Sequence, residues 1–397
     1  MNSKRKAQKQ VNPLKDPFKN FKKESLFTTQ PPLSKLYIEP TTQCNLQCRT
    51  CIRNSWNEPI GSMDMKVYRK LLADLKEIKT ISSIAFWGIG EPLTHSEIVD
   101  MVAEAHKMGL KTEVITNGHL LNRNISKGFI KAGLDTLVVS LDGTTQESYA
   151  DIRHGGDLLR VEHNIRDLNT LRAENTKRNP DIGLEFVIMK SNIDQLPELA
   201  QRAKSMGVDF IMLTNLLPCT EDMKDEILYW ISATINEVEE RSKWSQDLML
   251  PLMDLHTKYL TPLRELLKKL DRTMPEARNI PQEYCCPFIQ RGSAAVNWRG
   301  DVSPCVSLMH SYNCYILGRQ KFIKRYSVGN IVQEKIGDIW NKKTYRNFRD
   351  RVLKFDFPPC VQCSGCNLSE TNEEDCFGNV HPVCGDCLWA RSVLLCP

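Results

Sequence analysis

Short apolar runs alternate with stretches of helical spacing over the first 216 residues. The runs are rich in β-branched and aromatic residues, which is typical of strands buried in a parallel sheet. We expect one strand in each run. The runs cover residues 36–42, 83–90, 110–117, 136–142, 182–189 and 208–216.

Between these runs, apolar residues recur at intervals of three and four, as on the buried face of a helix. We expect these stripes to face the core and assign them no chemistry. The stripes lie within residues 68–75, 98–105, 158–168 and 196–206.

Three glycines, Gly109, Gly133 and Gly207, each end a helical stretch and precede an apolar run. Glycine suits a left-handed helix cap, because a Cβ atom is strained there. A helix that ends in this way before a strand is the returning half of a βα unit. Eight units would close a full (β/α)8 barrel, so six predict a partial, open (β/α)6 barrel. Its reactive centre belongs at the carboxyl ends of the strands.

The pattern divides the α/β chain into four parts. Two prolines, Pro275 and Pro281, interrupt the helical spacing near a boundary at 276–284. The helical part before them has Ile227, Trp230, Ile231 and Ile235 as its apolar face. We expect a flexible basic tail over 1–33, the barrel over 34–219, a helical connector over 220–283 and a cysteine-rich domain over 284–397.

Composition excludes several classes of protein. The chain of 397 residues is 41% hydrophobic and 25% charged, which argues against wholesale disorder. No apolar run approaches the roughly 18 residues of a membrane span. The net charge of +5 is too small to imply nucleic acid as a partner. The 15 cysteines are odd in number and no secretory signal precedes them, so we expect free thiols in the cytoplasm.

Three of these cysteines, Cys44, Cys48 and Cys51, follow the first expected strand with the spacing C-x3-C-x2-C. A tetrahedral zinc site needs four ligands, and no further Cys or His lies within twenty residues on either side. Three thiolates on a four-iron cluster would leave one iron open to another ligand. The alternative is a zinc loop that a distant Cys or His completes.

The cysteine loop matches the signature of the radical S-adenosylmethionine (radical SAM) superfamily, which the chain resembles at other strand ends too. The segment 88–92, Gly-Ile-Gly-Glu-Pro, resembles the superfamily's GGEP segment, and 140–143, Ser-Leu-Asp-Gly, resembles its ribose- or carboxylate-binding segment. Thr116-Asn117-Gly118 ends the third strand similarly. Two positions depart from the pattern. Thr50 stands where an aromatic residue is usual, and Ile89 replaces the second glycine.

The resemblance implies a [4Fe-4S] cluster on Cys44, Cys48 and Cys51, which reductively cleaves SAM to a 5′-deoxyadenosyl radical. Glu91 would meet the methionyl ammonium, and Ser140 and Asp142 would hydrogen-bond SAM. It implies a low-potential electron donor such as ferredoxin or flavodoxin. No catalytic residue is assigned beyond the cluster. The implied SAM-binding residues are Gly88, Gly90, Glu91, Pro92, Asn117, Ser140 and Asp142.

The C-terminal cysteines resemble the SPASM (twitch-like) extension of radical SAM enzymes, which binds one or two auxiliary [4Fe-4S] clusters. The spacing C-x13-G-x4-C from Cys286 to Cys305 fits that pattern, whereas the later spacing departs from it. Two fully ligated clusters need eight thiolates, so one of nine candidates is spare or one cluster is ligated differently. Zinc ribbons are the alternative for the CxxC pairs. The candidates are Cys286, Cys305, Cys360, Cys363, Cys366, Cys376, Cys384, Cys387 and Cys396. Those expected not to ligate are Cys219, Cys285 and Cys314.

The segments 369–379 and 384–389 resemble one subgroup more closely, the cofactor-modifying maturases of tungsten-containing aldehyde ferredoxin oxidoreductases. This resemblance implies modification of a tungsten–pterin cofactor, or of the protein or peptide that carries it. One alternative is a maturase that crosslinks or oxidises a ribosomal peptide. The first 35 residues are too short and too charged for the precursor-recognition domain that such an enzyme would need. The other alternative is a non-enzymatic iron–sulfur or zinc scaffold.

Overall fold

The computed structural model describes residues 30–175, 178–234, 248–254, 256–270, 286–363 and 366–395. Most of the basic tail expected over 1–33 therefore lies outside the described residues. In the described part, none of the helices has the length and apolar character needed to cross a membrane.

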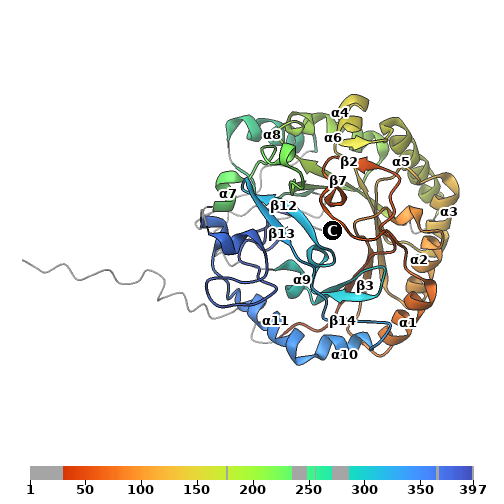
Figure 1. Cartoon of the computed structure of the whole chain (residues 1–397). Coiled ribbons are helices and arrows are strands. Elements are labelled where there is room, and N and C mark those ends of the chain that lie inside the picture. Colours follow the sequence, from red (N-terminus) through yellow and green to blue (C-terminus); the bar gives the residue numbers. More distant parts are fainter. Residues whose placement is uncertain are drawn as a thin grey trace, which may run out of the picture.

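The centre of the molecule is a parallel sheet with helices around its outer side (Figure 1). All six expected strands are present and pair in chain order, so the prediction of a partial barrel is confirmed. They are β1 (Lys35–Ile38), β3 (Ser83–Phe86), β4 (Lys111–Thr116), β5 (Thr136–Ser140), β7 (Asp181–Ile188) and β8 (Phe210–Asn215).

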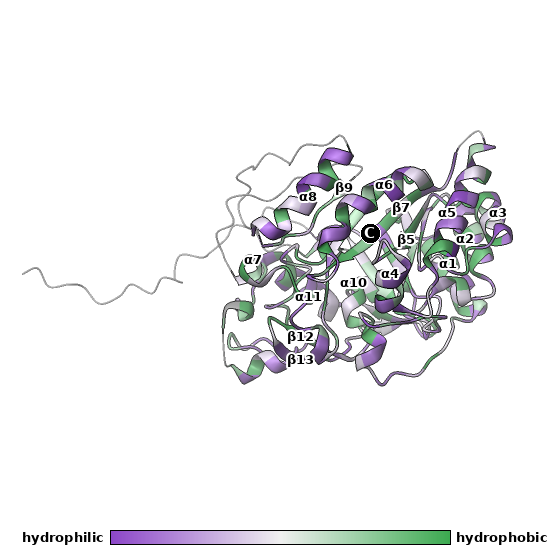
Figure 2. Cartoon of the chain, turned by 90° about the horizontal axis from the view of Figure 1, so that it is seen from above, coloured by the Kyte–Doolittle hydropathy of each residue, from purple (hydrophilic) through white to green (hydrophobic). Residues whose placement is uncertain are grey.

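The expected helical stripes lie on four helices and are buried against the sheet. Figure 2 shows hydrophobic colour on the inner strands and mixed colour on the surrounding helices. Gly109, Gly133 and Gly207 all have φ between +70° and +81°, as the predicted caps require. The barrel helices are α1 (Met65–Leu75), α2 (Ile98–Lys107), α3 (Arg123–Ala132), α4 (Gln146–Ile152), α5 (Leu158–Ala173) and α6 (Leu196–Met206).

The sheet extends beyond the six expected strands at both ends. Next to β8 lies β9 (Leu248–Met249), and β10 (Ser293–Val296) pairs in parallel with β1. Two antiparallel strands, β11 (Asp301–Ser303) and β14 (Gly329–Asn330), follow β10. The C-terminal region thus continues the barrel sheet through main-chain hydrogen bonds.

The expected helical connector is only partly helical. Its described helices are α7 (Trp230–Thr234) and α8 (Thr257–Lys269), and β9 lies between them. The proposed apolar face is wrong as a helix stripe. Ile227 is buried before α7 begins, whereas Trp230 and Ile231 on α7 are exposed. Ile235 lies outside the described residues. Periodicity misled here because Ile227 precedes the helix and the described part of α7 turns Trp230 and Ile231 toward solvent.

The C-terminal region holds a short helix α9 (Pro287–Gln290), a hairpin and two helices. The hairpin strands, β12 (Tyr312–Ile316) and β13 (Arg319–Ile323), pack in an apolar cluster of their own. The helices α10 (Ile336–Asn341) and α11 (Lys343–Lys354) lie beside the barrel, where α10 contacts α1.

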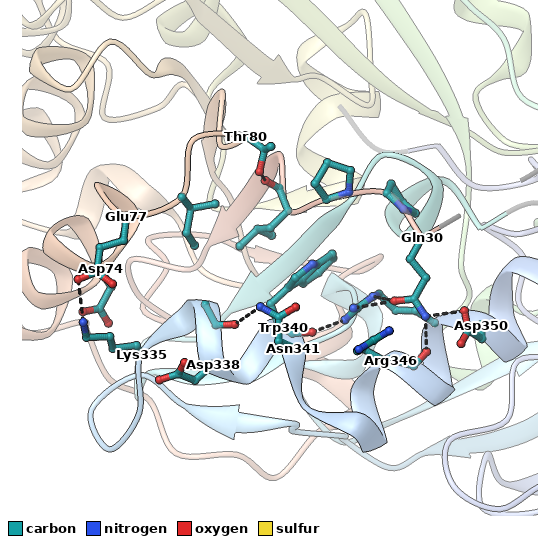
Figure 3. Close-up of a pocket in the computed structure, with 16 residues that line it drawn as sticks. Gln30, Asp74, Glu77, Thr80, Lys335, Asp338, Trp340, Asn341, Arg346 and Asp350 are labelled. Carbon is teal, nitrogen blue, oxygen red and sulfur yellow. Dashed lines mark hydrogen bonds and ion pairs between the residues drawn. The ribbon is translucent and has the colours of Figure 1, made fainter. Parts of the chain in front are cut away.

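A hollow of about 880 Å³ marks the junction of α10 and α11 with the segment before β1 (Figure 3). Gln30 is bound there on both sides. Its Oε1 accepts from Nη2 of Arg349 at 2.8 Å, and its Nε2 donates to the carbonyl of Arg346 at 2.8 Å. Lys335 pairs with Glu77 across the same hollow at 2.7 Å. These contacts join the C-terminal region to the barrel at the amino-terminal end of β1.

Candidate active site

The three-cysteine loop follows β1 at the carboxyl end of the sheet. Cys48 lies in β2 (Gln47–Cys48), which pairs antiparallel with β6 (Arg153–His154) so that Cys48 stands opposite Arg153. The amide of Cys51 donates to the carbonyl of Cys48 at 3.1 Å, which tightens the loop. The loop is therefore anchored at Cys48 by a two-stranded sheet.

The thiols of Cys44, Cys48 and Cys51 are free and partly buried. Burial is the main cause that raises the pKa of Cys48 to about 11. The charge of Arg153 opposes this shift, and the charges of Cys51 and Cys44 contribute to it. Burial likewise raises the pKa of Cys44 and Cys51. Each thiol is close enough to another to affect its ionisation, so the loop gathers all three as the sequence predicted.

This donor set fits an iron–sulfur cluster. Thiolates are the ligands of such clusters. The positive charge of the metal compensates the negative charge of a thiolate that is buried away from water. No group of three His, Cys, Asp or Glu side chains within the described ranges is arranged to hold a single metal ion. A cubane, in contrast, takes each thiolate on a different iron.

Two glycines let the segment 88–92 pack directly against the end of β1. A Cβ on Gly90 would lie 2.3 Å from the carbonyl oxygen of Thr41, and one on Gly88 would lie 2.4 Å from Cγ of Glu39. The amide of Glu91 donates to the carbonyl of Gln43 at 2.7 Å. Gly88 and Gly90 thus hold the segment 88–92 against the chain that leads into the cysteine loop.

The carboxylate of Glu91 points into the protein. It accepts from the amides of Leu93 at 3.0 Å and Asn117 at 2.7 Å, and from the hydroxyl of Thr116. Burial raises its pKa, although these donors oppose the effect. The carboxylate thus joins the segment after β3 to the end of β4. The contact of Glu91 and its segment with the SAM ammonium stays a prediction.

Two other predicted residues lie beside Glu91. Pro92 begins the short 3-10 helix Pro92–Thr94. Nδ2 of Asn117 donates to Oδ1 of Asn45 at 2.9 Å and lies 3.9 Å from Sγ of Cys44. Asn117 therefore contacts the cysteine loop, in keeping with a place beside the cofactor.

Ser140 and Asp142, at the end of β5, are also engaged by protein. The hydroxyl of Ser140 donates to Oε2 of Glu185 at 2.9 Å. Asp142 is fully buried, accepts from the amide of Val187 at 3.1 Å and pairs with Arg153 at 2.7 Å. Asp142 thus holds the guanidinium of the residue opposite Cys48, and its predicted hydrogen bond to SAM stays a prediction.

Sequence reasoning missed Arg153. Burial acts to lower its pKa, but Asp142 and Cys48 outweigh that effect and the pKa is raised. Its Nε has no hydrogen-bond partner among the described residues. A buried, partly unpaired guanidinium can bind a carboxylate or offset the charge of a cluster. The β2–β6 pairing and the ion pair with Asp142 place it there, and no motif in the sequence marks it.

Four cysteines of the C-terminal region line one apolar cavity between α9 and α11. Burial raises the pKa of Cys305, and the nearby Cys286 and Cys387 raise it further. Burial also raises the pKa of Cys384, and the nearby Cys387, Cys286 and Cys305 raise it further. Phe288 and Trp389 also line the cavity. Four converging thiols in an apolar shell fit a fully ligated cluster.

A second set lies on the loops farther along the chain. Cys360 and Cys366 are partly buried, Cys363 and Cys376 are exposed, and the charge of Cys376 acts on Cys360. Four other cysteines remain. Cys219 and Cys314 are buried and belong to neither set, whereas Cys285 and Cys396 lie outside the described residues.

A barrel that presents a three-cysteine loop at its carboxyl end, with cysteine sets beside it, defines a radical SAM enzyme with auxiliary clusters. Residues 38–202 match the radical SAM superfamily, and residues 285–367 match the SPASM iron-sulfur cluster-binding domain. The chain is 33% identical over 370 residues to the "Tungsten-containing aldehyde ferredoxin oxidoreductase cofactor-modifying protein" of Pyrococcus furiosus, covering 91% of this chain and 96% of the relative. The chain belongs to this radical SAM/SPASM family.

Two further comparisons agree. The chain is 26% identical over 230 residues to a PqqA peptide cyclase of Granulibacter bethesdensis, covering 54% of this chain and 58% of that protein. Streptococcus suis SuiB, solved with S-adenosylmethionine, shares the fold with a TM-score of 0.57 at 16% identity, covering 87% of this chain and 73% of that chain.

Family membership identifies the protein as a radical SAM enzyme of the maturase type. Its cofactors are a [4Fe-4S] cluster and SAM, with auxiliary iron–sulfur binding in the SPASM region. The alternative of a non-enzymatic scaffold is therefore wrong. The sequence prediction of the family, the fold class and the cofactors is confirmed.

Proposed function

We propose that this enzyme modifies the tungsten–pterin cofactor of an aldehyde ferredoxin oxidoreductase-like enzyme, or the protein or peptide that carries that cofactor. The observation that carries this proposal is the identity of 33% with the Pyrococcus furiosus cofactor-modifying protein, which extends over 91% of the chain. A shared module alone would match over a shorter range. The likeness includes the barrel, the connector and the cysteine-rich region together.

We assign Cys44, Cys48 and Cys51 as the ligands of the SAM-cleaving cluster. When bound, the cluster and SAM supply a one-electron reduction that generates a carbon radical able to abstract hydrogen. Asn117 borders this cluster through Cys44. Carbonyls of the segment 88–92 would accept from the SAM ammonium, while the contacts of Glu91 hold that segment in place and the two glycines allow its close packing.

Arg153 supports the same site by charge. It is buried beside Cys48 and held by Asp142 at 2.7 Å. A fixed guanidinium stabilises negative charge strongly where water is excluded. It therefore suits either the carboxylate of SAM or the thiolate-bound cluster, and its buried Nε has no hydrogen-bond partner among the described residues.

We assign the eight described C-terminal candidates to two auxiliary clusters. Cys286, Cys305, Cys384 and Cys387 would hold one cluster, because they line a common cavity. The remaining set would hold the second cluster at the surface, where two of its members are exposed. This set consists of Cys360, Cys363, Cys366 and Cys376.

We infer a cytoplasmic setting and a ferredoxin or flavodoxin as the electron donor. Thiolate-bound clusters and unpaired thiols need a reducing compartment. Electrons at low potential are required for reductive cleavage of SAM, and such small proteins deliver them. To test the electron donor, each purified candidate is reduced and mixed with the cluster-loaded enzyme. Reduction of the enzyme's clusters is then followed by optical absorbance.

The test of substrate uses the full chain with all clusters reconstituted under anaerobic conditions. An aldehyde ferredoxin oxidoreductase produced without this protein, and carrying deuterium in its pterin cofactor, is added with SAM and dithionite. We expect deuterium in 5′-deoxyadenosine and a mass change in the extracted cofactor. A C48A variant serves as the control, because it lacks one ligand of the SAM-cleaving cluster.

The outcome separates two substrate classes. A second sample carries deuterium in the polypeptide instead of the pterin. Deuterium transfer from this sample, with an unchanged pterin, would move the substrate to the cofactor-bearing polypeptide. Formation of 5′-deoxyadenosine without any transfer from the oxidoreductase would contradict the proposal.

A ribosomal peptide is the second candidate substrate. The observation in its favour is the 26% identity to a PqqA peptide cyclase, which covers only about half of each chain. Short precursor peptides encoded near the gene would be added to the same assay. A crosslinked or oxidised peptide, detected by its loss of hydrogen mass, would favour this candidate.

A further inference from the structure

We propose that His310, in the C-terminal region, is a positioning residue for SAM. It acts through Glu39, which holds the segment 88–92 in its binding conformation. The SAM site of the barrel is then complete only when the auxiliary-cluster region is docked against it. This inference deepens the proposed function without depending on the identity of the substrate, because it concerns SAM alone.

Glu39 lies directly after β1 and is fully buried. Its Oε1 accepts from the amide of Ile89 at 3.1 Å, within the segment assigned to SAM. Its side chain also fills the space beside Gly88, where a Cβ would approach Cγ of Glu39 to 2.4 Å. Glu39 therefore contacts the segment 88–92 both by a hydrogen bond and by packing.

His310 holds this carboxylate from the opposite side. Its Nε2 lies 2.8 Å from Oε2 and 3.0 Å from Oε1 of Glu39, and the ring is 1% exposed. The edge of the ring contacts Trp56 with 5.0 Å between ring centroids. Trp56 follows the cysteine loop and pairs with Tyr312 on β12. Both the ring and the carboxylate are thus fixed between barrel and hairpin.

The other ring nitrogen faces the remaining charges of this cluster. Nδ1 of His310 has no hydrogen-bond partner among the described residues and lies 3.9 Å from Oε2 of Glu58. Glu58 accepts from the amide of Ser311 at 3.1 Å and pairs with Arg299 at 3.1 Å. Glu58 thus holds the chain beside His310, so the imidazole cannot leave Glu39 without moving this segment.

A buried carboxylate needs its partners. If the His310 donor is removed, Glu39 remains buried with only the Ile89 amide, and such a group either turns away or draws in water. Because no free space separates Glu39 from Gly88, either movement displaces the segment 88–92. The site would then bind SAM less tightly, although every direct SAM contact is still present in the chain.

The experiment compares H310F, H310Q and R349M with the unchanged protein, each as the full cluster-loaded chain. H310F keeps a buried ring but loses the donor, whereas the amide of H310Q can still donate to Glu39. R349M removes another buried contact between barrel and C-terminal region, the one with Gln30 at the opposite end of the sheet. It controls for general loss of stability.

Three quantities are measured: iron content, the dissociation constant of SAM, and hydrogen exchange of a peptide that contains Ile89. For H310F we expect unchanged iron, SAM affinity reduced on the order of tenfold, and faster exchange at Ile89. In SAM cleavage without substrate, KM should rise more than kcat falls. H310Q should recover most of the affinity, and R349M should lower only the melting temperature.

Two results would overturn the inference. One is normal SAM affinity in H310F with intact iron content. The other is an equal loss of SAM affinity in H310F and R349M, which would show that any weakening of the contact between the regions has this effect. Neither result bears on the substrate, since no substrate is present in these measurements.

Discussion

Asp142 and Arg153 carry opposite charges at a place that water does not reach. They are 0% and 8% exposed and lie 2.7 Å apart. Removing one partner of a buried ion pair leaves the other charge uncompensated, which costs about 3–5 kcal/mol. Exposed pairs contribute far less, about 0–1 kcal/mol. The residues beside the cysteine loop therefore differ widely in their importance for stability.

We expect D142A to lower the free energy of unfolding by about 3–5 kcal/mol, because Arg153 would remain buried and unpaired. Urea unfolding of the cluster-loaded chain measures this loss. D151A is the matched control, since Asp151 forms an exposed pair with Arg49 at the same distance of 2.7 Å. If D142A unfolds as late as D151A, Asp142 does not hold Arg153 in place.

Glu185 provides a prediction about pH. Burial raises the pKa of Glu185 in the folded protein, and the nearby charge of Asp142 raises it too. The hydrogen bond from Ser140 and the charge of Arg153 act in the opposite direction. A raised folded-state pKa means that its contribution to stability is full below about pH 4.3, the unfolded-state value. That contribution is lost as the pH rises through the folded-state value.

The variant E185Q does not titrate but keeps an oxygen for the hydroxyl of Ser140. Its melting temperature should therefore exceed that of the unchanged protein by an amount that grows as the pH rises above about 4.3. Thermal unfolding across this range measures the difference. A difference that is independent of pH would mean that Glu185 does not change its ionisation on folding.

At the scale of elements, the site depends on loops that touch without side chains between them. The segment 88–92 meets the end of β1 at Gly90, where a Cβ would lie 2.3 Å from a carbonyl oxygen. A backbone neighbour cannot rotate away as a side chain can. The absence of a Cβ atom at Gly90 therefore sets the distance between the segment 88–92 and the chain that leads into the cysteine loop.

We expect G90A to cost about 1–3 kcal/mol of stability through overpacking, and also to reduce SAM binding and the iron held by the cysteine loop. G109A is the control. Gly109 has φ +81° and no atom within 4 Å of a new Cβ, so alanine brings only backbone strain of about 1–2 kcal/mol. Iron content and SAM affinity should distinguish the two variants. Equal losses in both would show that the close contact at Gly90 is unimportant.

Local patterns predicted much of this architecture. The six barrel strands, the four helix stripes between them and the left-handed glycines follow from preferences of neighbouring residues and were found where expected, whereas the stripe expected in the connector was not. The three-cysteine loop was visible because its ligands are adjacent in sequence. The pairing of Cys48 with Arg153 was not, because it joins segments about one hundred residues apart.

Other contacts were hidden from the sequence for the same reason. Nothing in the segment 140–143 reveals that Glu185 engages Ser140 and that Arg153 engages Asp142. The strand β10 has the sequence Ser-Ala-Ala-Val, which is too short and too small to stand out as a strand. Its partner β1 lies more than 250 residues away. Such contacts form only when the whole sheet assembles, so local sequence patterns do not reveal them.

At the scale of the whole molecule, barrel and C-terminal region share one sheet. All four residues of β10 pair in parallel with those of β1, so β1 is an inner strand and not an edge. Buried apolar clusters and the contacts of Gln30 and His310 reinforce this junction. The regions are therefore expected to be stable only together.

A chain that ends at residue 283 would leave β1 as an exposed edge. Leu36 and Ile38 are fully buried, and an unpaired apolar edge strand promotes aggregation. We expect this truncated chain to form soluble aggregates or to precipitate, which size-exclusion chromatography detects. Deletion of residues 1–29 is the control, because it leaves every described strand pair intact. A monomeric, folded 1–283 fragment would contradict this expectation.

The sheet that contains both β10 and β1 also restricts how electrons can move between the two regions. Because main-chain hydrogen bonds join the two regions, the separation between the iron of the barrel and the iron of the C-terminal region is built into the fold. Tunnelling rates depend steeply on such separations. Swinging one region away from the other would break these hydrogen bonds, so we do not expect such a movement to regulate electron transfer between the two regions. We expect regulation to depend instead on the arrival of a reduced donor or of the substrate.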